Sequence, residues 1–367
     1  MANNITYYRF IEMMDKEQLN INWINKVSKA NRNADKIWVE KVIRALLLLE
    51  GLVQAEIPFV FKSGTSLMLH FNTSKRLSID IDIIIAEEIA NFEAILKSIA
   101  SKQNFTRVEL QQRTAHTDIE KAYYKFFYPP IHKTAKEEEY ILLDILFEEI
   151  GYTQIIELPI SSSFVPDNGK PIMVKVPSLE DLLGDKLTAF APNTTGIPYF
   201  KDNDSMSMEI IKQLYDIGNL FDRSTNLATV KATFHRFVET ELAYRKANDK
   251  TETDVLDDIF NTALCIVSRG DLGEGNFDEL QLGIKRIAGF IFSENFHIEK
   301  AIVSASKASY LATLIATDKA AFEKFETPIQ LKDWMISDPA YNKLNKLKKS
   351  NPEAFFYWYK IMELKIE

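Results

Sequence analysis

The sequence predicts an α+β protein in two parts: an N-terminal half built around a mixed sheet, and an all-helical C-terminal half. Runs of β-branched and aromatic residues typical of strands occur between residues 59 and 176. From residue 179 onward, apolar residues recur at helical spacing. A chain of 367 residues is long enough for two domains. We therefore expect an α+β domain over residues 1–170 and a helical domain over residues 171–367.

The N-terminal half begins with helices and continues into the sheet. A clear helix is predicted over residues 34–54 and must end before Pro58. A short strand over residues 59–62 leads into the turn Ser63-Gly64-Thr65 and a short helix over residues 66–71. A helix is also predicted over residues 87–100. The other predicted strands are residues 78–85, 105–113, 123–128, 139–147, 155–158 and 172–176.

The C-terminal half begins at a predicted helix cap. Ser178 is followed by Leu179-Glu180-Asp181, a pattern that favours Ser178 as the N-cap. Turn-forming residues cluster just before it, at 161–171, which marks the domain boundary. Short polar loops between the later helices favour a bundle. The main predicted helices are residues 206–221, 227–247, 254–268, 277–292 and 298–316.

The composition limits the classes of function. The net charge of −8 does not favour nucleic-acid binding, so such binding would need a local basic patch. A single cysteine, Cys265, excludes an intramolecular disulfide and a Cys-rich zinc site. The N-terminus has no signal-peptide pattern, and no apolar run is long enough to span a membrane. We expect a cytoplasmic protein with no membrane partner.

Two acidic residues inside an isoleucine-rich run are the most informative feature. Asp is depleted in strands, yet Asp80 and Asp82 alternate with Ile79, Ile81 and Ile83. At a spacing of two, strand side chains point to the same face. Two adjacent carboxylates raise each other's pKa unless a cation lies between them, and a hard divalent ion such as Mg²⁺ or Mn²⁺ suits their oxygen atoms. The alternative is an edge residue beside a turn residue.

A turn upstream of this pair favours a phosphate site. Gly64 permits close approach of the backbone, and the start of the following helix offers N–H groups to an anion. The hydroxyls of Thr65 and Ser66 can add donors. A phosphate cradle followed by paired carboxylates is typical of phosphoryl or nucleotidyl transfer.

These residues resemble a known family. Lys62-Ser63-Gly64-Thr65-Ser66-Leu67, followed after eight residues by Arg76-x-Ser78-x-Asp80-Ile81-Asp82, is similar to the AbiEii/AbiGii-type nucleotidyltransferase toxins of the DNA polymerase β-like superfamily. The family usually has Gly where this chain has Ser63. Two later segments, residues 181–189 with Lys186 and residues 212–217 with Asp216, resemble further motifs of that family. The resemblance implies a polymerase β-like domain followed by helices that contribute Lys186 and Asp216 to the cleft.

The candidate site residues follow from both arguments. Asp80 and Asp82 are expected to hold metal, and Asp144 is the best candidate for a third carboxylate, with Glu148 a weaker one. The alternative for Asp144 is an edge-strand residue. The predicted catalytic set is Asp80, Asp82, Asp144, Lys186 and Asp216. The predicted nucleotide-binding set is Lys62, Ser63, Gly64, Thr65, Arg76, Ser78, Lys186 and Lys212.

Several of these residues have structural alternatives. The resemblance implies that Lys186 contacts the triphosphate, but its spacing alone would indicate a solvated helix lysine. Asp216 either orients Lys186 or acts as a base, or it is an acid on a helix surface. Lys212 lies four residues before Asp216, so the two could form an i,i+4 pair with a purely structural role. Arg76 either binds phosphate or pairs with a nearby acid.

The sequence thus predicts a metal-dependent nucleotidyltransferase that uses an NTP and Mg²⁺ or Mn²⁺. The resemblance implies the toxin of an abortive-infection or toxin–antitoxin pair, with a cognate antitoxin as partner. It also implies RNA as the acceptor, with tRNA 3′ ends as the leading candidate. One alternative is a module that senses NTP without transferring it. Another is transfer to a small molecule such as an aminoglycoside.

Overall fold

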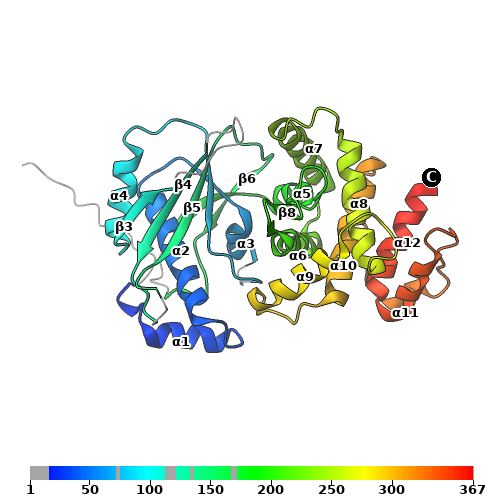
Figure 1. The fold of residues 1–367 in the computed structure, drawn as a ribbon, viewed down its shortest axis with the longest axis horizontal. Helices are drawn as coiled ribbons and strands as arrows, with labels where there is room; N and C mark the ends of the chain where they lie inside the picture. The colour runs from blue at the N-terminus through cyan, green and yellow to red at the C-terminus, as the bar shows by residue number, and fades with distance from the viewer. Residues whose placement is uncertain (1–15, 72–74, 112–120, 133–135, 167–171, 367) are drawn as a thin grey trace, which may run out of the picture. The chain divides into compact units, whose positions relative to one another are not determined.

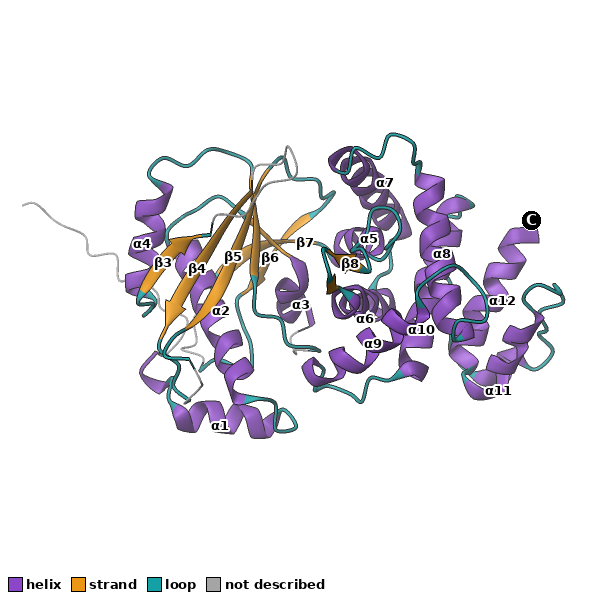
Figure 2. Cartoon of the chain, in the orientation of Figure 1, coloured by secondary structure: helices purple, strands orange, loops and turns teal. Residues whose placement is uncertain are grey.

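The computed structural model describes residues 16–71, 75–111, 121–132, 136–166 and 172–366. It divides into two compact units. The first comprises residues 1–150 and 155–176, and the second comprises residues 151–154 and 177–367. The first unit combines a sheet with helices, and the second is almost entirely helical, which confirms the predicted α+β class with a helical C-terminal part (Figure 2).

A five-stranded mixed sheet forms the centre of the first unit. Its strand order is β1-β2-β5-β4-β3. The pair β2–β5 is parallel, whereas β1–β2, β4–β5 and β3–β4 are antiparallel. The bounds are β1 (Val60–Lys62), β2 (Ile81–Ile85), β3 (Arg107–Leu110), β4 (Lys121–Tyr128) and β5 (Glu139–Phe147). The mixed sheet is as predicted, and β5 has the predicted bounds.

Helices cover one face of this sheet. Helix α2 (Lys36–Gln54) packs on β2 and β5, and α4 (Phe92–Lys102) packs on β3 (Figure 1). The strand residues on this face are buried, and the ring of Phe92 from α4 meets Tyr124 of β4 edge-to-face at 6.2 Å. The unit also contains η1 (Lys16–Gln18), α1 (Ile21–Ala30), α3 (Ser63–Phe71), and a two-stranded sheet of β6 (Ile155–Pro159) and β7 (Met173–Pro177).

The second unit is almost entirely helical. Ser178 caps α5, because its hydroxyl accepts the backbone N–H of Asp181, as predicted. The hairpin of β8 (Phe200–Lys201) and β9 (Asp204–Ser205) was not predicted. The main helices are α5 (Leu179–Ala189), α6 (Ser207–Arg223), α7 (Leu227–Tyr244), α8 (Glu252–Ser268), α9 (Phe277–Ile287), α10 (Ile298–Ala316), α11 (Leu347–Ser350) and α12 (Pro352–Ile366). The 3-10 helices are η2 (Ala288–Phe290), η3 (Pro328–Leu331) and η4 (Asn342–Lys346).

Three predicted boundaries near the candidate site were wrong. The residues Ser63-Gly64-Thr65 form the first turn of α3 instead of a separate turn. The strand predicted from residue 78 begins at Ile81, so Asp80 lies just before β2. The helix predicted from residue 87 begins at Phe92, after a cap at Asn91 with a left-handed φ of 57°. Within the described residues, no helix is both long and apolar enough to cross a membrane.

Candidate active site

Two of the predicted carboxylates lie side by side on the sheet. Asp82 of β2 is the register partner of Asp144 on the adjacent parallel strand β5. Lys62 of β1 is the register partner of Asp82 on the other side. Register partners project from the same face of a sheet and are near neighbours. One row across three strands therefore carries a lysine and two carboxylates, all half-buried.

Burial along β5 explains why Asp144 faces this way. Ile141, Leu143 and Ile145 are completely buried, and the residues between them are only half-buried. The apolar residues set the register by occupying the helix-covered face, which leaves Asp144 on the opposite face. Because β5 lies between β2 and β4, the alternative that Asp144 is an edge-strand residue was wrong.

Asp80 is held at the beginning of β2 by the helix before it. The hydroxyl of Thr65, which is fully buried in α3, donates a hydrogen bond of 2.7 Å to the carbonyl oxygen of Asp80. The Asp80 side chain is exposed. The Thr65 hydroxyl thus fixes the backbone beside the carboxylates, and direct binding of nucleotide by Thr65 stays a prediction.

Gly64 makes room for an arginine. A Cβ atom at this position would lie 2.3 Å from Nη2 of Arg76 and 3.0 Å from the hydroxyl oxygen of Ser78. Arg76 is 7% exposed, and its Nη1 donates to the carbonyl oxygen of Leu77 at 3.4 Å. Three predicted nucleotide-binding residues, Gly64, Arg76 and Ser78, are therefore in close contact. Of Ser63 only the backbone is described; its predicted role lies outside the described side chains.

In the helical unit, Lys186 and Asp216 form a buried pair. The ammonium nitrogen of Lys186, on α5, lies 3.5 Å from a carboxylate oxygen of Asp216 on α6, and the two residues are 6% and 2% exposed. The alternatives of a solvated lysine and a surface acid were therefore wrong. Lys186 also donates a 2.9 Å hydrogen bond to the side-chain oxygen of Gln213. The two acceptors lie about one turn apart on α6 and hold the ammonium in place.

Lys212 forms an ion pair with Glu209 and not with Asp216, the partner that the sequence analysis considered. Its ammonium bonds both carboxylate oxygens of Glu209, at 2.8 and 3.1 Å, and lies 5.4 Å from the ring centroid of Phe290. The proposed i,i+4 pair with Asp216 was wrong, because Asp216 turns to the buried side of α6. Binding of nucleotide by Lys212 stays a prediction.

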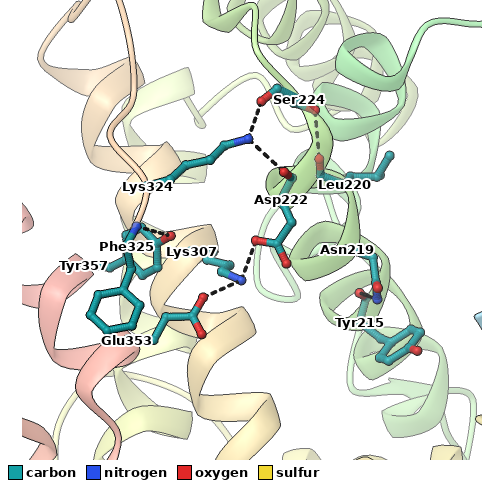
Figure 3. Close-up of polar contacts among 10 residues, drawn as sticks. All are labelled: Tyr215, Asn219, Leu220, Asp222, Ser224, Lys307, Lys324, Phe325, Glu353 and Tyr357. Carbon is teal, nitrogen blue, oxygen red and sulfur yellow. Dashed lines mark hydrogen bonds and ion pairs between the residues drawn. The ribbon is translucent and has the colours of Figure 1, made fainter. Parts of the chain in front are cut away.

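The C-terminal end of α6 is fixed by two lysines, as Figure 3 shows. Lys324 donates to the carbonyl oxygens of Asp222 and Ser224, both at 2.8 Å. The buried Lys307 of α10 bridges the carboxylates of Asp222 and Glu353 at 2.7 and 2.8 Å. Cations at a helix C-terminus satisfy its last carbonyl groups and oppose its dipole. Desolvation lowers the pKa of Lys324 below its ordinary value. The helix that carries Gln213 and Asp216 is thus anchored to α10 and α12.

A cavity of about 920 Å³ lies within the helical unit and does not suit nucleotide phosphates. Its lining includes five carboxylates and only two cationic side chains. One of the carboxylates, Asp258, accepts hydrogen bonds from the backbone N–H of Asn193 at 2.8 Å and the hydroxyl of Thr194 at 2.9 Å. The charged lining residues are Asp254, Asp257, Asp258, Glu274, Asp278, Lys250 and Arg269.

The geometry can be compared with known proteins. A family model described as "Nucleotidyl transferase AbiEii toxin, Type IV TA system" matches residues 47–296, well over half of the chain. The chain belongs to the AbiEii nucleotidyltransferase toxin family. This match spans the candidate residues of both units, from Lys62 to Asp216. The resemblance and the enzyme class predicted from the sequence are thereby confirmed.

The solved structures that match this AbiEii-family chain include two that share little sequence with it. JHP933 from Helicobacter pylori is 15% identical, with a TM-score of 0.41, and the alignment covers 76% of this chain and 90% of that protein. An antigenic nucleotidyltransferase-like protein from Paracoccidioides brasiliensis is 13% identical, with a TM-score of 0.35, covering 60% and 93%. No curated protein matches the chain.

The donor set of this AbiEii-family chain fits a magnesium ion that also binds substrate. Mg²⁺ is commonly held by one or two carboxylates together with substrate phosphates and water. Asp82 and Asp144 supply two half-buried carboxylates in register. In the described part of the chain, no group of three or more His, Cys, Asp or Glu side chains is arranged as a metal site. Metal binding by Asp80, Asp82 and Asp144 therefore stays a prediction, in which nucleotide phosphates complete the ligand set.

Sequence reasoning missed two contacts at these positions. The side chain of Gln213 holds Lys186, whereas the sequence analysis of residues 212–217 pointed only to Asp216. The contact of Arg76 with Gly64 was also missed. The spacing of three between Gln213 and Asp216 places both on one side of a helix, and could have indicated a shared partner. Nothing in the sequence identifies which residue the guanidinium of Arg76 packs against.

Proposed function

We propose that this AbiEii-family nucleotidyltransferase uses Mg²⁺ or Mn²⁺ to transfer a nucleotidyl group from an NTP to a hydroxyl of RNA, with tRNA 3′ ends as the first candidate. The register pairing of Asp82 with Asp144 carries the proposal, because it places two carboxylates on one face of the sheet. The family description as a toxin of a Type IV toxin–antitoxin system supports a cognate antitoxin as partner.

The reaction joins the acceptor oxygen to the α-phosphorus of the NTP. The bond from that phosphorus to the bridging oxygen of the β-phosphate breaks, and pyrophosphate leaves. In this proposal Asp80, Asp82 and Asp144 would hold the metal, and Asp144 would also accept the proton of the attacking hydroxyl. A bound divalent ion would supply charge neutralisation on the phosphates. Arg76, packed against Gly64 at the start of α3, would bind a phosphate oxygen, as its fork of N–H donors favours.

The resemblance of residues 181–189 to a family motif also implies that Lys186 would contact the triphosphate. The helical unit supports this role in one respect: the ammonium is buried and its position is fixed by Asp216 and Gln213. A cation whose position is fixed before substrate binds stabilises developing charge without reorganising during the reaction. Asp216 would then act by orienting Lys186.

Incubation with each NTP labelled at its α-phosphate, Mg²⁺ and total RNA tests this proposal. We expect label in RNA, and a loss of at least about a hundredfold in Asp82→Asn and Asp144→Asn, since each removes part of the metal site. Asp202→Asn is a matched control, because Asp202 is exposed in the turn of the β8–β9 hairpin, at a φ of 54° that asparagine tolerates.

Two outcomes would contradict the proposal. Label on a small molecule but on no RNA would reject the RNA acceptor. Retention of full transfer by Asp82→Asn and Asp144→Asn, with both variants folded, would reject these carboxylates as the metal site.

A further inference from the structure

The face of the sheet opposite α2 and α4 carries a row of aromatic and cationic side chains. On β4, the residues that alternate with the buried Tyr124, Phe126 and Tyr128 are Lys121, Tyr123, Lys125 and Phe127. Their burial pattern is clear: Lys121 is exposed and the other three are half-buried. A strand buried on one face only shows this alternation, and its second face usually carries polar residues. The aromatic rings of Tyr123 and Phe127 on this second face therefore indicate a role other than packing in the core.

The row is continuous with the carboxylates. Tyr123 is the register partner of Asp144, and Phe127 is the register partner of Tyr140 on β5. Asp144 and Tyr140 are four positions apart, which corresponds to about 13 Å along the strand. We name Tyr123, Lys125, Phe127 and Tyr140 the aromatic row. It therefore begins beside Asp144 and runs away from it across β4 and β5.

Cations lie against the rings of this row. Nζ of Lys125 is 4.5 Å from the ring centroid of Tyr140. The guanidinium of Arg107 lies 3.7 Å from the ring centroid of Phe127. The rings of Phe127 and Tyr140 are themselves 5.8 Å apart. Ring faces and guanidinium planes both stack on nucleobases, and ammonium groups bind phosphates.

Three nearby glutamates are bound to other cations. Glu139 pairs with Lys41 at 2.8 Å. Glu109, the register partner of Lys125, accepts a 2.8 Å hydrogen bond from Arg107, which also pairs with Glu138. Within the described residues, Lys121 and Lys125 form no ion pair. The two lysines therefore make this face locally attractive to phosphates although the chain as a whole is acidic.

We propose that the aromatic row is a binding surface for single-stranded nucleic acid, on which two or three nucleotides stack before the strand reaches Asp144. A four-stranded sheet whose exposed aromatic side chains stack two or three bases is an established mode of single-strand recognition. The proposal rests on the proposed function in one respect: an acceptor 3′ end must reach the carboxylates. Binding itself does not depend on transfer and can be measured separately.

Binding of a fluorescent single-stranded RNA of about twelve nucleotides to the full chain, by anisotropy and without NTP, tests the proposal. We expect Tyr123→Leu and Tyr140→Leu, which keep apolar bulk but lose the ring, each to weaken binding about tenfold. Lys125→Gln should lower the slope of log affinity against log salt by about 0.7. Lys97→Gln is the matched control, because Lys97 is exposed on α4, the helix that packs on the opposite face of the sheet. This variant should bind the RNA as tightly as the unchanged protein does.

The outcomes separate this inference from the proposed function. Unchanged RNA affinity in both Tyr→Leu variants and in Lys125→Gln, with unfolding temperatures preserved, would overturn the inference even if nucleotidyl transfer to RNA is observed. Loss of binding in these variants would support it even if no transfer to RNA is found. Equal loss of affinity for single-stranded DNA would still support a stacking surface, whereas binding of a protein partner alone would overturn it.

Discussion

Single residues at the candidate site act mainly by fixing other residues. Thr65 holds the backbone of Asp80, Gly64 leaves room for Arg76, and Gln213 holds Lys186. Such contacts keep charged groups in place before substrate binds. Substitutions at these positions should therefore change activity more than stability.

Gly64→Ala tests the contact with Arg76. The new methyl group would lie 2.3 Å from the guanidinium, so Arg76 must move. We expect at least a tenfold loss of kcat/KM for nucleotidyl transfer, because a displaced catalytic or binding group loses its orientation. Gly289→Ala is the control, since a Cβ there meets no atom within 4 Å. Equal activity in the two variants would show that the position of Arg76 is not needed.

Asp216→Asn tests the buried pair on α5 and α6. The substitution keeps the shape of the side chain but removes the charge that lies 3.5 Å from the Lys186 ammonium. We expect a fall of at least tenfold in transfer rate, together with lower stability in urea, because a buried ammonium loses its ionic partner. Arg223→Gln, at an exposed position of the same helix, should change activity less than twofold; a matching loss there would indicate a general effect on α6.

Close backbone approach decides how the helices of the second unit pack. A Cβ on Gly184 of α5 would lie 2.7 Å from the carbonyl oxygen of Val230 and 3.0 Å from the backbone nitrogen of Phe234, both on α7. Backbone atoms cannot rotate away as a flexible side chain can. The two helices are therefore in contact because position 184 has no side chain. Helix α5 also carries Lys186, so this packing fixes the helix that holds the lysine.

Gly184→Ala should consequently destabilise the protein by about 1–3 kcal/mol through overpacking, although alanine is the better helix former. Urea unfolding followed by circular dichroism measures this free energy. Gly289→Ala again provides the reference, and no destabilisation of Gly184→Ala relative to it would show that α5 and α7 can separate at little cost.

At the scale of the whole molecule, the chain passes between the two units three times. It enters the second unit for residues 151–154, returns for residues 155–176, and then stays in the second unit. The fully buried carboxylate of Asp181 binds this short segment: it accepts the backbone N–H groups of Thr153 at 2.6 Å and Gln154 at 3.0 Å. It also accepts the hydroxyls of Ser178 and Thr233.

Asp181→Ala should therefore lower the unfolding free energy by on the order of 3 kcal/mol or more, because each buried donor that loses its acceptor costs about 1–3 kcal/mol. Thermal unfolding followed by circular dichroism measures the effect. Asp257→Ala, at an exposed position of α8, should leave the unfolding temperature nearly unchanged. A similar unfolding temperature in the two variants would show that Asp181 does not hold the segment.

The sequence by itself determined the local features of this protein. Alternating isoleucines and paired aspartates predicted the strand and the carboxylates, and Ser178 predicted the start of α5, because periodicity and capping depend on residues close in the chain. Only the tertiary structure decided the rest. Strand order placed Asp144 beside Asp82, and helix packing buried Lys186 against Asp216. These contacts join residues 62 and 30 positions apart, and no local pattern specifies which distant segments meet.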